Sequence, residues 1–409
     1  MEPIQQPVSD YVLRDTLPVV RPGVVLFALA MGSFAIGTTE FATMSLLPYF
    51  ARGLGIDEPT AGHVVSAYAM GVVVGAPTIA VLAARLPRKA LLLGLMLVFG
   101  LANVLSAMAP TYGWLLAFRF LSGLPHGAYF GVAALFGASL VPAERRASAV
   151  ARIMIGLTVA TIIGVPTANW IGQAVGWRIG FVLVGALALL TIALVWVFAP
   201  NSPAAAGASP LRELGALKRP QVWLTLGIGA IGFGGIFAVY TYVASTLLEV
   251  THVSAALVPV ILCIFGVGAT LGTLVCGWAA DKAQTLSIVL TLVASVISLA
   301  LYPFAAHNIW TLGFDIFFVG CSTGLAIILQ TRLMDVAGDA QTLAAALNHS
   351  AFNFANALGP FLGGLAIAAG WGLTSTGFVG CGLAVGGLIM LGFSLLYSRL
   401  SRPKVRDVG

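Results

Sequence analysis

The sequence predicts an all-α membrane protein with twelve transmembrane helices in two parallel six-helix halves. Three observations lead to this prediction: the composition, the recurrence of apolar runs, and an internal repeat. Hydrophobic residues make up 59% of the 409 residues and charged residues only 8%, whereas an ordinary soluble domain carries roughly 25% charged residues. The 48 glycines suit close helix packing in lipid. We therefore expect the chain to lie in a bilayer.

The apolar runs have the length that a helix needs to cross a bilayer, about 20 residues. Only helices and closed barrels satisfy the backbone in lipid, and runs of this length indicate helices. The first six cover residues 22–50, 60–84, 90–109, 112–140, 147–175 and 179–199, and the second six cover 222–248, 255–280, 286–305, 309–334, 342–369 and 373–397. The predicted organisation is a tail (1–21), an N-terminal bundle (22–199), a linker (200–221), a C-terminal bundle (222–397) and a second tail (398–409).

Lysine and arginine predict the orientation, because they gather on the cytoplasmic side of membrane proteins. With the N-terminus in the cytoplasm, 17 of the 20 basic residues fall on that side. They are Arg14, Arg21, Arg85, Arg88, Lys89, Arg145, Arg146, Arg152, Arg212, Lys218, Arg219, Lys282, Arg332, Arg399, Arg402, Lys404 and Arg406. Arg52 and Arg178 lie in outer loops, and Arg119 lies inside a span. Both termini are therefore expected in the cytoplasm, and the pI of about 9.3 reflects topology rather than a nucleic-acid partner.

The two halves repeat each other. Gly123 and Gly127 match Gly320 and Gly324 at a shift of 197 residues. Two further dipeptides recur at shifts of 198 and 194: Arg21-Pro22 with Arg219-Pro220, and Gly176-Trp177 with Gly370-Trp371. Two parallel halves with a site between them near the midplane are the arrangement of a secondary transporter.

A single carboxylate, Glu40, interrupts the first apolar run. A charge at that depth costs roughly 2.5–3.5 kcal/mol on insertion scales and normally faces an internal cavity with a partner. Arg119 lies in an antiparallel span at a similar depth, so the two side chains can meet. The repeat aligns Glu40 with Ala238, so this carboxylate belongs to the first half alone. The pair is either a proton switch or a permanent buried ion pair that fixes packing.

Two further titratable residues lie within spans. His126 follows Arg119 by seven residues, on the same helix face. The reference pKa of histidine, about 6.5, suits a proton relay, but a neutral imidazole bonded to a neighbouring helix is the alternative. Asp315 lies near the outer end of its span, close to the position that the repeat gives Arg119. It is either a hydrated carboxylate at the mouth or a coupling residue.

Polar and aromatic side chains inside the spans are candidate substrate contacts. Thr38 and Thr39 precede Glu40, and His349, Asn353 and Asn356 form a stripe at i, i+4 and i+7. The stripe could instead make interhelical hydrogen bonds, typically worth about 0.6 kcal/mol each. The aromatic candidates, which could instead be packing or interfacial anchors, are Tyr129, Phe130, Tyr240 and Tyr242.

Candidate gating residues lie at a bend and at two loops. Gly164 and Pro166 loosen the fifth helix and allow bending or tight packing against the eighth. The basic residues Arg85, Arg88 and Lys89 follow the second span, and Asp281 takes the corresponding place in the second half.

Several motifs resemble one transporter family. They are TTEF (38–41), TAGH (60–63), GVVVGAP (71–77), RFLSGLPHGAYFG (119–131), GVP (164–166) and AFNFANALGPFLGG (351–364). Together they resemble the major facilitator superfamily, within it the drug:proton antiporter branch, and most closely the arabinose-efflux-permease-like group of sugar, nucleoside and chloramphenicol exporters. The resemblance implies the major facilitator fold. It also implies an acid in the loop between the second and third helices that helps to close the cytoplasmic side, but this chain has Ala84 there and retains an acid only at Asp281.

These observations together predict a proton-coupled exporter of small organic molecules in the bacterial cytoplasmic membrane. We expect a monomer that works by alternating access, uses the proton gradient and no cofactor, and binds no metal. The chain has no G-x-x-x-x-G-K-[ST] loop for ATP. Alternatives are an uncoupled or proton-symport importer of a small polar metabolite and a transporter-like membrane sensor. An enzyme is not expected, because no nucleophile, base and metal ligands converge. The four cysteines lie in apolar runs and predict free thiols.

The orientation can be tested with cysteine labelling. A Ser209→Cys variant places a thiol in the predicted cytoplasmic linker, so an impermeant maleimide added to intact cells should not label it. Ready labelling from outside would reverse the predicted topology.

Overall fold

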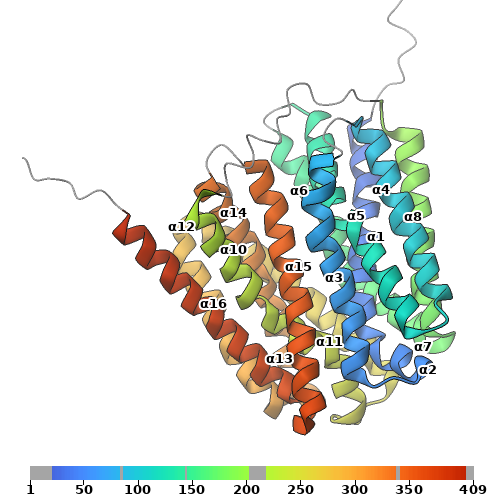
Figure 1. Cartoon of the computed structure of the whole chain (residues 1–409), viewed down its shortest axis with the longest axis vertical. Coiled ribbons are helices and arrows are strands. Elements are labelled where there is room, and N and C mark those ends of the chain that lie inside the picture. Colours follow the sequence, from blue (N-terminus) through green and yellow to red (C-terminus); the bar gives the residue numbers. More distant parts are fainter. Residues whose placement is uncertain (1–20, 83–85, 143–144, 202–217, 338–340, 402–409) are drawn as a thin grey trace, which may run out of the picture.

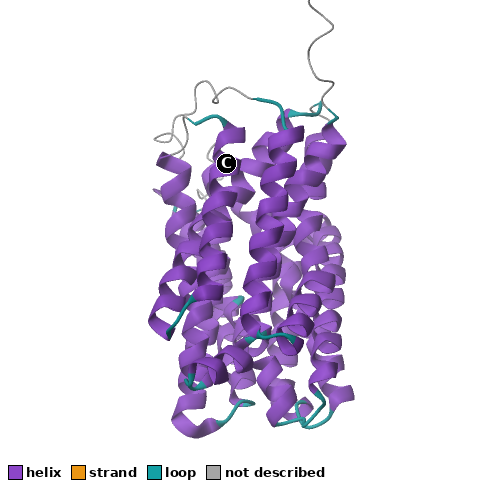
Figure 2. Ribbon diagram, turned by 90° about the vertical axis from the view of Figure 1, so that its right-hand side faces the viewer, coloured by secondary structure: helices purple, strands orange, loops and turns teal. Residues whose placement is uncertain are grey.

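The computed structural model describes residues 21–82, 86–142, 145–201, 218–337 and 341–401. Most of both predicted tails, most of the linker and Arg85 lie outside the described residues. Within these ranges the chain is helical and contains no strand, and the helices run roughly along one direction (Figure 2). The architecture is therefore the predicted all-α one.

The first half contains six spans, two of them interrupted. The elements are α1 (Pro22–Ser45) continued by α2 (Leu47–Leu54), α3 (Glu58–Leu82), α4 (Arg88–Met108), α5 (Tyr112–Ser139), α6 (Arg146–Val159) continued through the π-helix η2 (Ala160–Gly164) into α7 (Val165–Ala174), and α8 (Trp177–Phe198). The second half continues with α10 (Pro220–Gly232), α11 (Gly234–Glu249), η4 (Ala255–Leu257), α12 (Val258–Ala305), α13 (Ile309–Cys321), η5 (Ser322–Gly324), α14 (Leu325–Ala337), α15 (Gln341–Ala366), η6 (Ile367–Trp371) and α16 (Ser375–Leu400).

The element α12 contains two of the predicted spans. Its backbone leaves the helical region at Ala283, with φ −155° and ψ 70°. The Sγ of Cys276 lies 3.5 Å from the Oγ1 of Thr291, which a straight helix could not allow across 15 residues, so the chain folds back at Ala283. Ten segments of the described chain are long and apolar enough to cross a membrane, and α12 counts once among them while α5 is not included. The twelve predicted spans are thereby all accounted for.

The repeat is visible in the backbone packing of the two halves. α3 packs against α5 in the first half as the first arm of α12 packs against α13 and η5 in the second. Glycines make these contacts so close that an added Cβ would overlap a carbonyl oxygen of the facing helix. At the shift of 197 residues the contacts correspond: Gly71 on Phe120 with Gly268 on Phe317, Gly75 on Leu124 with Gly272 on Cys321, and Gly123 on Tyr68 with Gly320 on Phe265. The internal repeat is confirmed at these glycines.

The halves lie side by side and contact each other mainly through α3 with α15, α7 and η2 with α12, and α1 with α11 (Figure 1). We call the end at which α8 ends and α10 begins the linker end, and the opposite end the far end. Near the far end, Ser66 donates to the carbonyl of Ala357 at 2.9 Å, and Gln173 donates to that of Ala255 at 3.0 Å. These bonds join the two halves at the far end.

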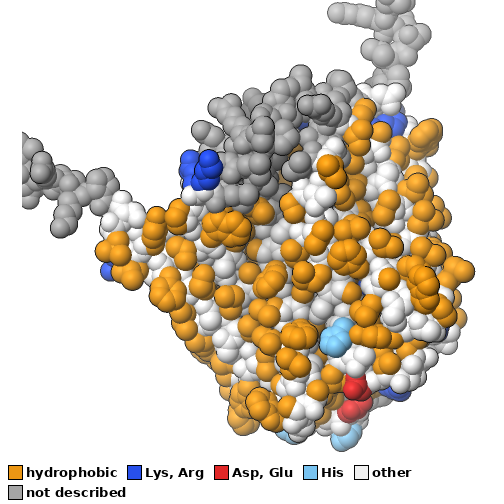
Figure 3. All heavy atoms as spheres, viewed as in Figure 1, with side chains coloured by type: hydrophobic (Ala, Val, Ile, Leu, Met, Phe, Trp, Pro, Cys, Tyr) orange, Lys and Arg blue, Asp and Glu red, His pale blue; other side chains and the backbone are white. Residues whose placement is uncertain are grey.

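The sides of the molecule are apolar. Large hydrophobic side chains are exposed on nearly every helix, and on the face shown in Figure 3 they cover the middle band while acidic side chains lie near the far end. This surface suits contact with lipid chains, as expected for a multi-pass membrane protein.

The close glycine contacts predict where the fold tolerates a methyl group. Gly75→Ala and Gly272→Ala should each lower stability, because backbone faces both sites and overpacking typically costs about 1–3 kcal/mol. Matched controls are Gly94→Ala and Gly382→Ala, which face open space. Thermal unfolding in detergent, followed by loss of monodisperse protein, measures the effect. Equal melting temperatures for all four variants would contradict the packing.

Candidate functional site

Glu40 lies where the two halves meet. Its side chain is 8% exposed, and its Oε1 accepts a hydrogen bond of 2.9 Å from the Nδ2 of Asn356 in α15, in the other half. Across the described residues no lysine or arginine forms an ion pair with it. Arg119 acts on it only through space. The intramembrane carboxylate is thus held by one neutral amide.

Arg119 is held by neutral partners too. Its side chain is 1% exposed, and Nη1 donates to Thr39 at 3.1 Å and to Asn103 and Ser122 at 3.4 Å. The guanidinium carbon lies 4.3 Å from the ring centre of Tyr68, a cation–π distance. The ion pair between Glu40 and Arg119, one of the two alternatives from the sequence, is therefore absent among the described residues of this structure.

The reason lies in the direction of successive side chains on α1. Residues of an α-helix are about 100° apart around its axis, so neighbours face different helices. Thr38 packs against Gly164 and donates to the carbonyl of Phe34 at 2.7 Å. Thr39 donates to the Oδ1 of Asn103 at 2.7 Å, on the side of Arg119. Glu40 points the other way, into the second half.

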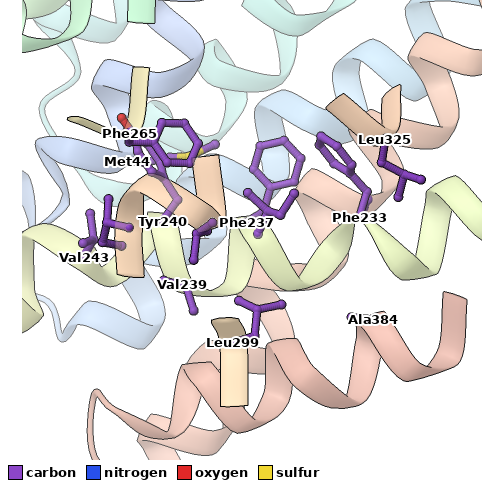
Figure 4. Close-up of a cluster of buried hydrophobic side chains, with 14 of the residues drawn as sticks. Met44, Phe233, Phe237, Val239, Tyr240, Val243, Phe265, Leu299, Leu325 and Ala384 are labelled. Carbon is purple, nitrogen blue, oxygen red and sulfur yellow. The ribbon is translucent and has the colours of Figure 1, made fainter. Parts of the chain in front are cut away.

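Phe41, the fourth of these successive residues on α1, also faces its own group of neighbours. Its ring centre lies 5.5 Å from that of Tyr240 and 6.2 Å from that of Phe265. Tyr240 and Phe265 are themselves 4.1 Å apart and belong to the buried apolar cluster of Figure 4, which also includes Met44 of α1. The hydroxyl of Tyr240 has no hydrogen-bond partner in the described structure. Tyr240 is thus surrounded by apolar groups at the contact between the halves.

A row of rings crosses from one half to the other. The hydroxyl of Tyr68 lies 2.9 Å from Nδ1 of His126, whose side chain is 3% exposed. The His126 ring lies 5.3 Å from that of Phe130, and Phe130 stacks on His349 of α15 at 5.3 Å with parallel planes. His126 has the hydrogen bond expected of a structural imidazole, and its relay role stays a prediction.

The polar stripe of His349, Asn353 and Asn356 on α15 includes side-chain oxygens that accept no hydrogen bond from the described residues. Asn353 donates to the carbonyl of His349 at 3.0 Å, within its own helix, and Asn356 donates to Glu40. The Oδ1 atoms of both asparagines are buried and lack partners among the described residues. Buried polar atoms normally have partners, so these two acceptors are candidates for contact with a substrate or water.

Two of the predicted aromatic residues make hydrogen bonds within their own halves. The hydroxyl of Tyr129 donates to the carbonyl of Leu29 at 2.7 Å, and that of Tyr242 donates to the carbonyl of Pro360 at 2.9 Å. These bonds agree with a packing role in this conformation. Of the four aromatic candidates, Phe130, Tyr240 and Tyr242 lie at the contact between the halves, and Tyr242 packs there against Gly62 of α3.

The Gly164–Pro166 segment has the predicted effect on the fifth span. The π-helix η2 ends at Gly164, immediately before the first turn of α7 that contains Pro166. Proline lacks the N–H that an α-helix needs, and π-turns accommodate such interruptions. A Cβ on Gly266 of α12 would lie 2.6 Å from the carbonyl oxygen of Thr161. The π-helix η2 therefore packs tightly against the eighth span, whereas Gly164 itself contacts Thr38 and Phe34 of α1.

The loop residues bond within one half. Arg88 donates to the carbonyl of Leu135 at 3.3 Å. Lys89 donates to the carbonyls of Trp196 and Ala199 at 2.9 and 2.6 Å, where a cation stabilises the C-terminal end of α8. Asp281 is exposed. A latch between the halves through these side chains stays a prediction.

Sequence reasoning missed Asn103, Tyr68, Asn169 and Gln173. Asn103 joins Thr39 to Arg119, and Tyr68 joins Arg119 to His126. Asn103 carried a signal, since it is the one amide in its span and a buried arginine needs acceptors. Asn169 donates to the carbonyl of Ser45 at 2.8 Å, and Gln173 donates both to Asn169 and across the halves.

No metal-binding chemistry is evident in the described ranges, where no three histidine, cysteine or acidic side chains lie together. All four cysteines are free thiols, as predicted.

Comparisons with known proteins agree with this geometry. A model of the Major Facilitator Superfamily matches residues 29–341. The chain is 39% identical to the inner membrane transport protein YdhP of Escherichia coli K12 over 381 residues, which cover 93% of this chain and 96% of that protein. It is 34% identical to a chloramphenicol resistance protein of Streptomyces lividans, covering 82% of this chain and 87% of that one. The fold resembles the crystal structure of the nucleoside transporter NupG, with a TM-score of 0.74 and 15% identity over 92% of this chain and 99% of that chain.

Double-mutant cycles should separate the partners of Arg119. The cycle Arg119→Met with Asn103→Leu should give a coupling energy of about 1.5–3 kcal/mol, because hydrogen bonds to charged groups are worth this much. The cycle Arg119→Met with Glu40→Gln should give a smaller one, since no ion pair joins them. Unfolding free energies in lipid–detergent micelles provide the values. A larger coupling to Glu40 than to Asn103 would contradict this arrangement.

Proposed function

Because the chain belongs to the Major Facilitator Superfamily, we propose that it is a proton-coupled antiporter that exports small organic molecules by alternating access. The observation that carries the proposal is the bond between Glu40 and Asn356, which joins the two halves with no cation at the carboxylate. A transported proton needs a site whose charge state changes a contact between the halves, and this carboxylate provides one.

The coupling step follows from the donors and acceptors involved. An ionised Glu40 can only accept hydrogen bonds, and it accepts from Asn356. A protonated Glu40 loses the charge that strengthens this hydrogen bond, and its O–H becomes a donor for which the Oδ1 of Asn356, unpartnered among the described residues, is an acceptor. Proton binding therefore changes the contact between α1 and α15, and proton release restores it.

Movement of the halves must open the far end. The bonds of Ser66 with Ala357 and of Gln173 with Ala255 close that end in this structure. In the proposed cycle, they break when the halves rock apart at the far end, and the substrate leaves there while Glu40 takes up a proton. The proton then returns to the linker side as the far end closes again.

The substrate class follows from what the contact between the halves offers. Asn353 and Asn356 present acceptors without partners, while Phe130 and His349 present flat rings. These groups suit a neutral molecule with hydroxyl or amide donors and an aromatic or sugar ring. The name of the Streptomyces relative points to chloramphenicol, which has both features and is therefore the first probe; sugars and nucleosides are further candidates.

We place the protein in the bacterial inner membrane as a monomer, with both termini in the cytoplasm and the proton gradient as its energy source. The electrical part of that gradient supplies about 2.3 kcal/mol per charge per 100 mV. An importer that moves proton and substrate together would use the same carboxylate. The direction of proton movement during substrate flux distinguishes the two.

A Glu40→Gln variant should lose coupling while retaining the fold. Glutamine keeps an acceptor for Asn356 but cannot exchange a proton, so uphill export of chloramphenicol should fall to the passive level. Proteoliposomes with an imposed pH gradient, radiolabelled chloramphenicol and a trapped pH dye measure both fluxes. The matched control is Asp57→Asn, an exposed carboxylate at the far end that accepts from the backbone of Thr60, and it should transport like wild type.

Two outcomes of the same assay would contradict the proposed function. If Glu40→Gln pumps chloramphenicol against its gradient at near the wild-type rate, Glu40 is structural. If chloramphenicol flux drives protons in the same direction as the drug, the protein is a symporter.

A further inference from the structure

A second buried carboxylate lies in the C-terminal half. Asp315 is the seventh residue of α13, about 9 Å along the helix from its first residue at 1.5 Å per residue. Its side chain is only 6% exposed. The expectation of a hydrated carboxylate at the mouth is therefore wrong for this residue.

The surroundings of Asp315 contain one donor and no cation. The hydroxyl of Ser298, in the second arm of α12, donates to Oδ1 at 2.9 Å. Oδ2 is buried and has no partner in the described chain. No lysine, arginine or histidine of the described ranges forms an ion pair with the carboxylate. An ionised carboxylate in this setting keeps a desolvated oxygen without compensation.

The elements packed against α13 supply one further titratable group. α13 contacts both arms of α12, and it touches α11 and η5. Tyr302 of α12 interacts electrostatically with Asp315, and its hydroxyl donates to Thr246 of α11 at 2.9 Å. The groups that face Asp315 are thus Ser298, Tyr302 and, beyond it, Thr246, none of which is cationic.

Contacts also link Asp315 to a helix at the contact between the two halves. α11 lies at the contact with the first half, since it packs against α1 and α2. Tyr302 and Ser298 are four residues apart on one helix face, and Tyr302 ties that face to α11 through Thr246. When α11 moves relative to α12 and α13, the surroundings of the Asp315 carboxylate change.

We propose that Asp315 is a second proton-binding site, which takes up a proton in the conformation seen here and releases it when α11 moves. The step is the addition of a proton to the carboxylate, which gives a carboxylic acid and changes no other bond. As part of a transport cycle it rests on the proposed function. This second site adds a proton stoichiometry to the proposed function: one proton binds to Glu40 between the halves, and one binds to Asp315 within the C-terminal half.

The direct test needs no substrate. Infrared difference spectra of the full chain in lipid nanodiscs, recorded between acid and alkaline pH, contain the C=O stretch of carboxyl groups that gain a proton. Asp315→Asn, which keeps an acceptor for Ser298, should remove one component. Glu40→Gln should remove a different one. An unchanged C=O region in folded Asp315→Asn protein would overturn the proposal.

A second variant keeps the test valid if Asp315→Asn does not fold. Ser298→Ala removes the hydrogen bond to Oδ1 and leaves the carboxyl group, so it should shift the frequency of one C=O component without removing it. The matched control is Ser295→Ala, one turn earlier on the same arm, whose hydroxyl has no partner. Equal spectra for Ser298→Ala and wild type would count against Asp315.

The transport ratio separates this proposal from the proposed function. At zero membrane potential and a pH difference of one unit, two protons per neutral chloramphenicol support a gradient of about 100-fold, and one proton about 10-fold. Wild type should reach the first and Asp315→Asn the second. A 10-fold limit in wild type would overturn the second site, whereas absence of any chloramphenicol-driven proton movement would count against the proposed function and leave the infrared result to decide on Asp315.

Discussion

The hydrogen bond between Glu40 and Asn356 is the polar contact between the two halves on which the proposed mechanism depends. A membrane offers no water to a buried carboxylate, so Glu40 must find its partner within the protein, and that partner belongs to the opposite half. Around this bond the neighbours of Glu40 fix α1 against other helices: Thr38 against Gly164, Thr39 against Asn103, and Phe41 against Tyr240. One helix turn thus contacts both halves.

The strength of this bond matters for movement. Breaking a buried ion pair by loss of one partner costs roughly 3–5 kcal/mol. A direct pair of Glu40 with Arg119 would also lie within the first half, so its formation or loss would not change a contact with the second half. A hydrogen bond between a carboxylate and an amide is worth about 1.5–3 kcal/mol. That energy is comparable with the roughly 2.3 kcal/mol that one charge gains across 100 mV. Arg119 can stay apart because neutral oxygens and the Tyr68 ring stabilise its charge.

The sequence was sufficient to predict how far along its helix each residue lies, but not which neighbouring helix its side chain faces. Hydropathy and length predicted the spans, the glycine repeat predicted the two halves, and the bend at Gly164 and Pro166 followed from proline chemistry. Depth alone could not decide whether Glu40 and Arg119 form an ion pair, and none forms here because adjacent residues on α1 face different neighbours. Depth also left two alternatives for Asp315: its distance from the helix end was right, and its side chain is buried beside Ser298 rather than hydrated at the mouth.

The repeat gives the two halves the same backbone packing, while their buried charges differ. The carbonyl contacts of Gly71, Gly75 and Gly123 recur at Gly268, Gly272 and Gly320, so both halves are built on the same rigid pairing of helices. The charged side chains inside the spans do not follow the repeat: Glu40 aligns with Ala238, and Arg119 with Ile316 beside Asp315. In the proposed transport cycle, this repeated backbone supports two conformations of similar energy. The asymmetric charges then let a proton or a substrate favour one of them, because only differential binding to the two states can shift the equilibrium.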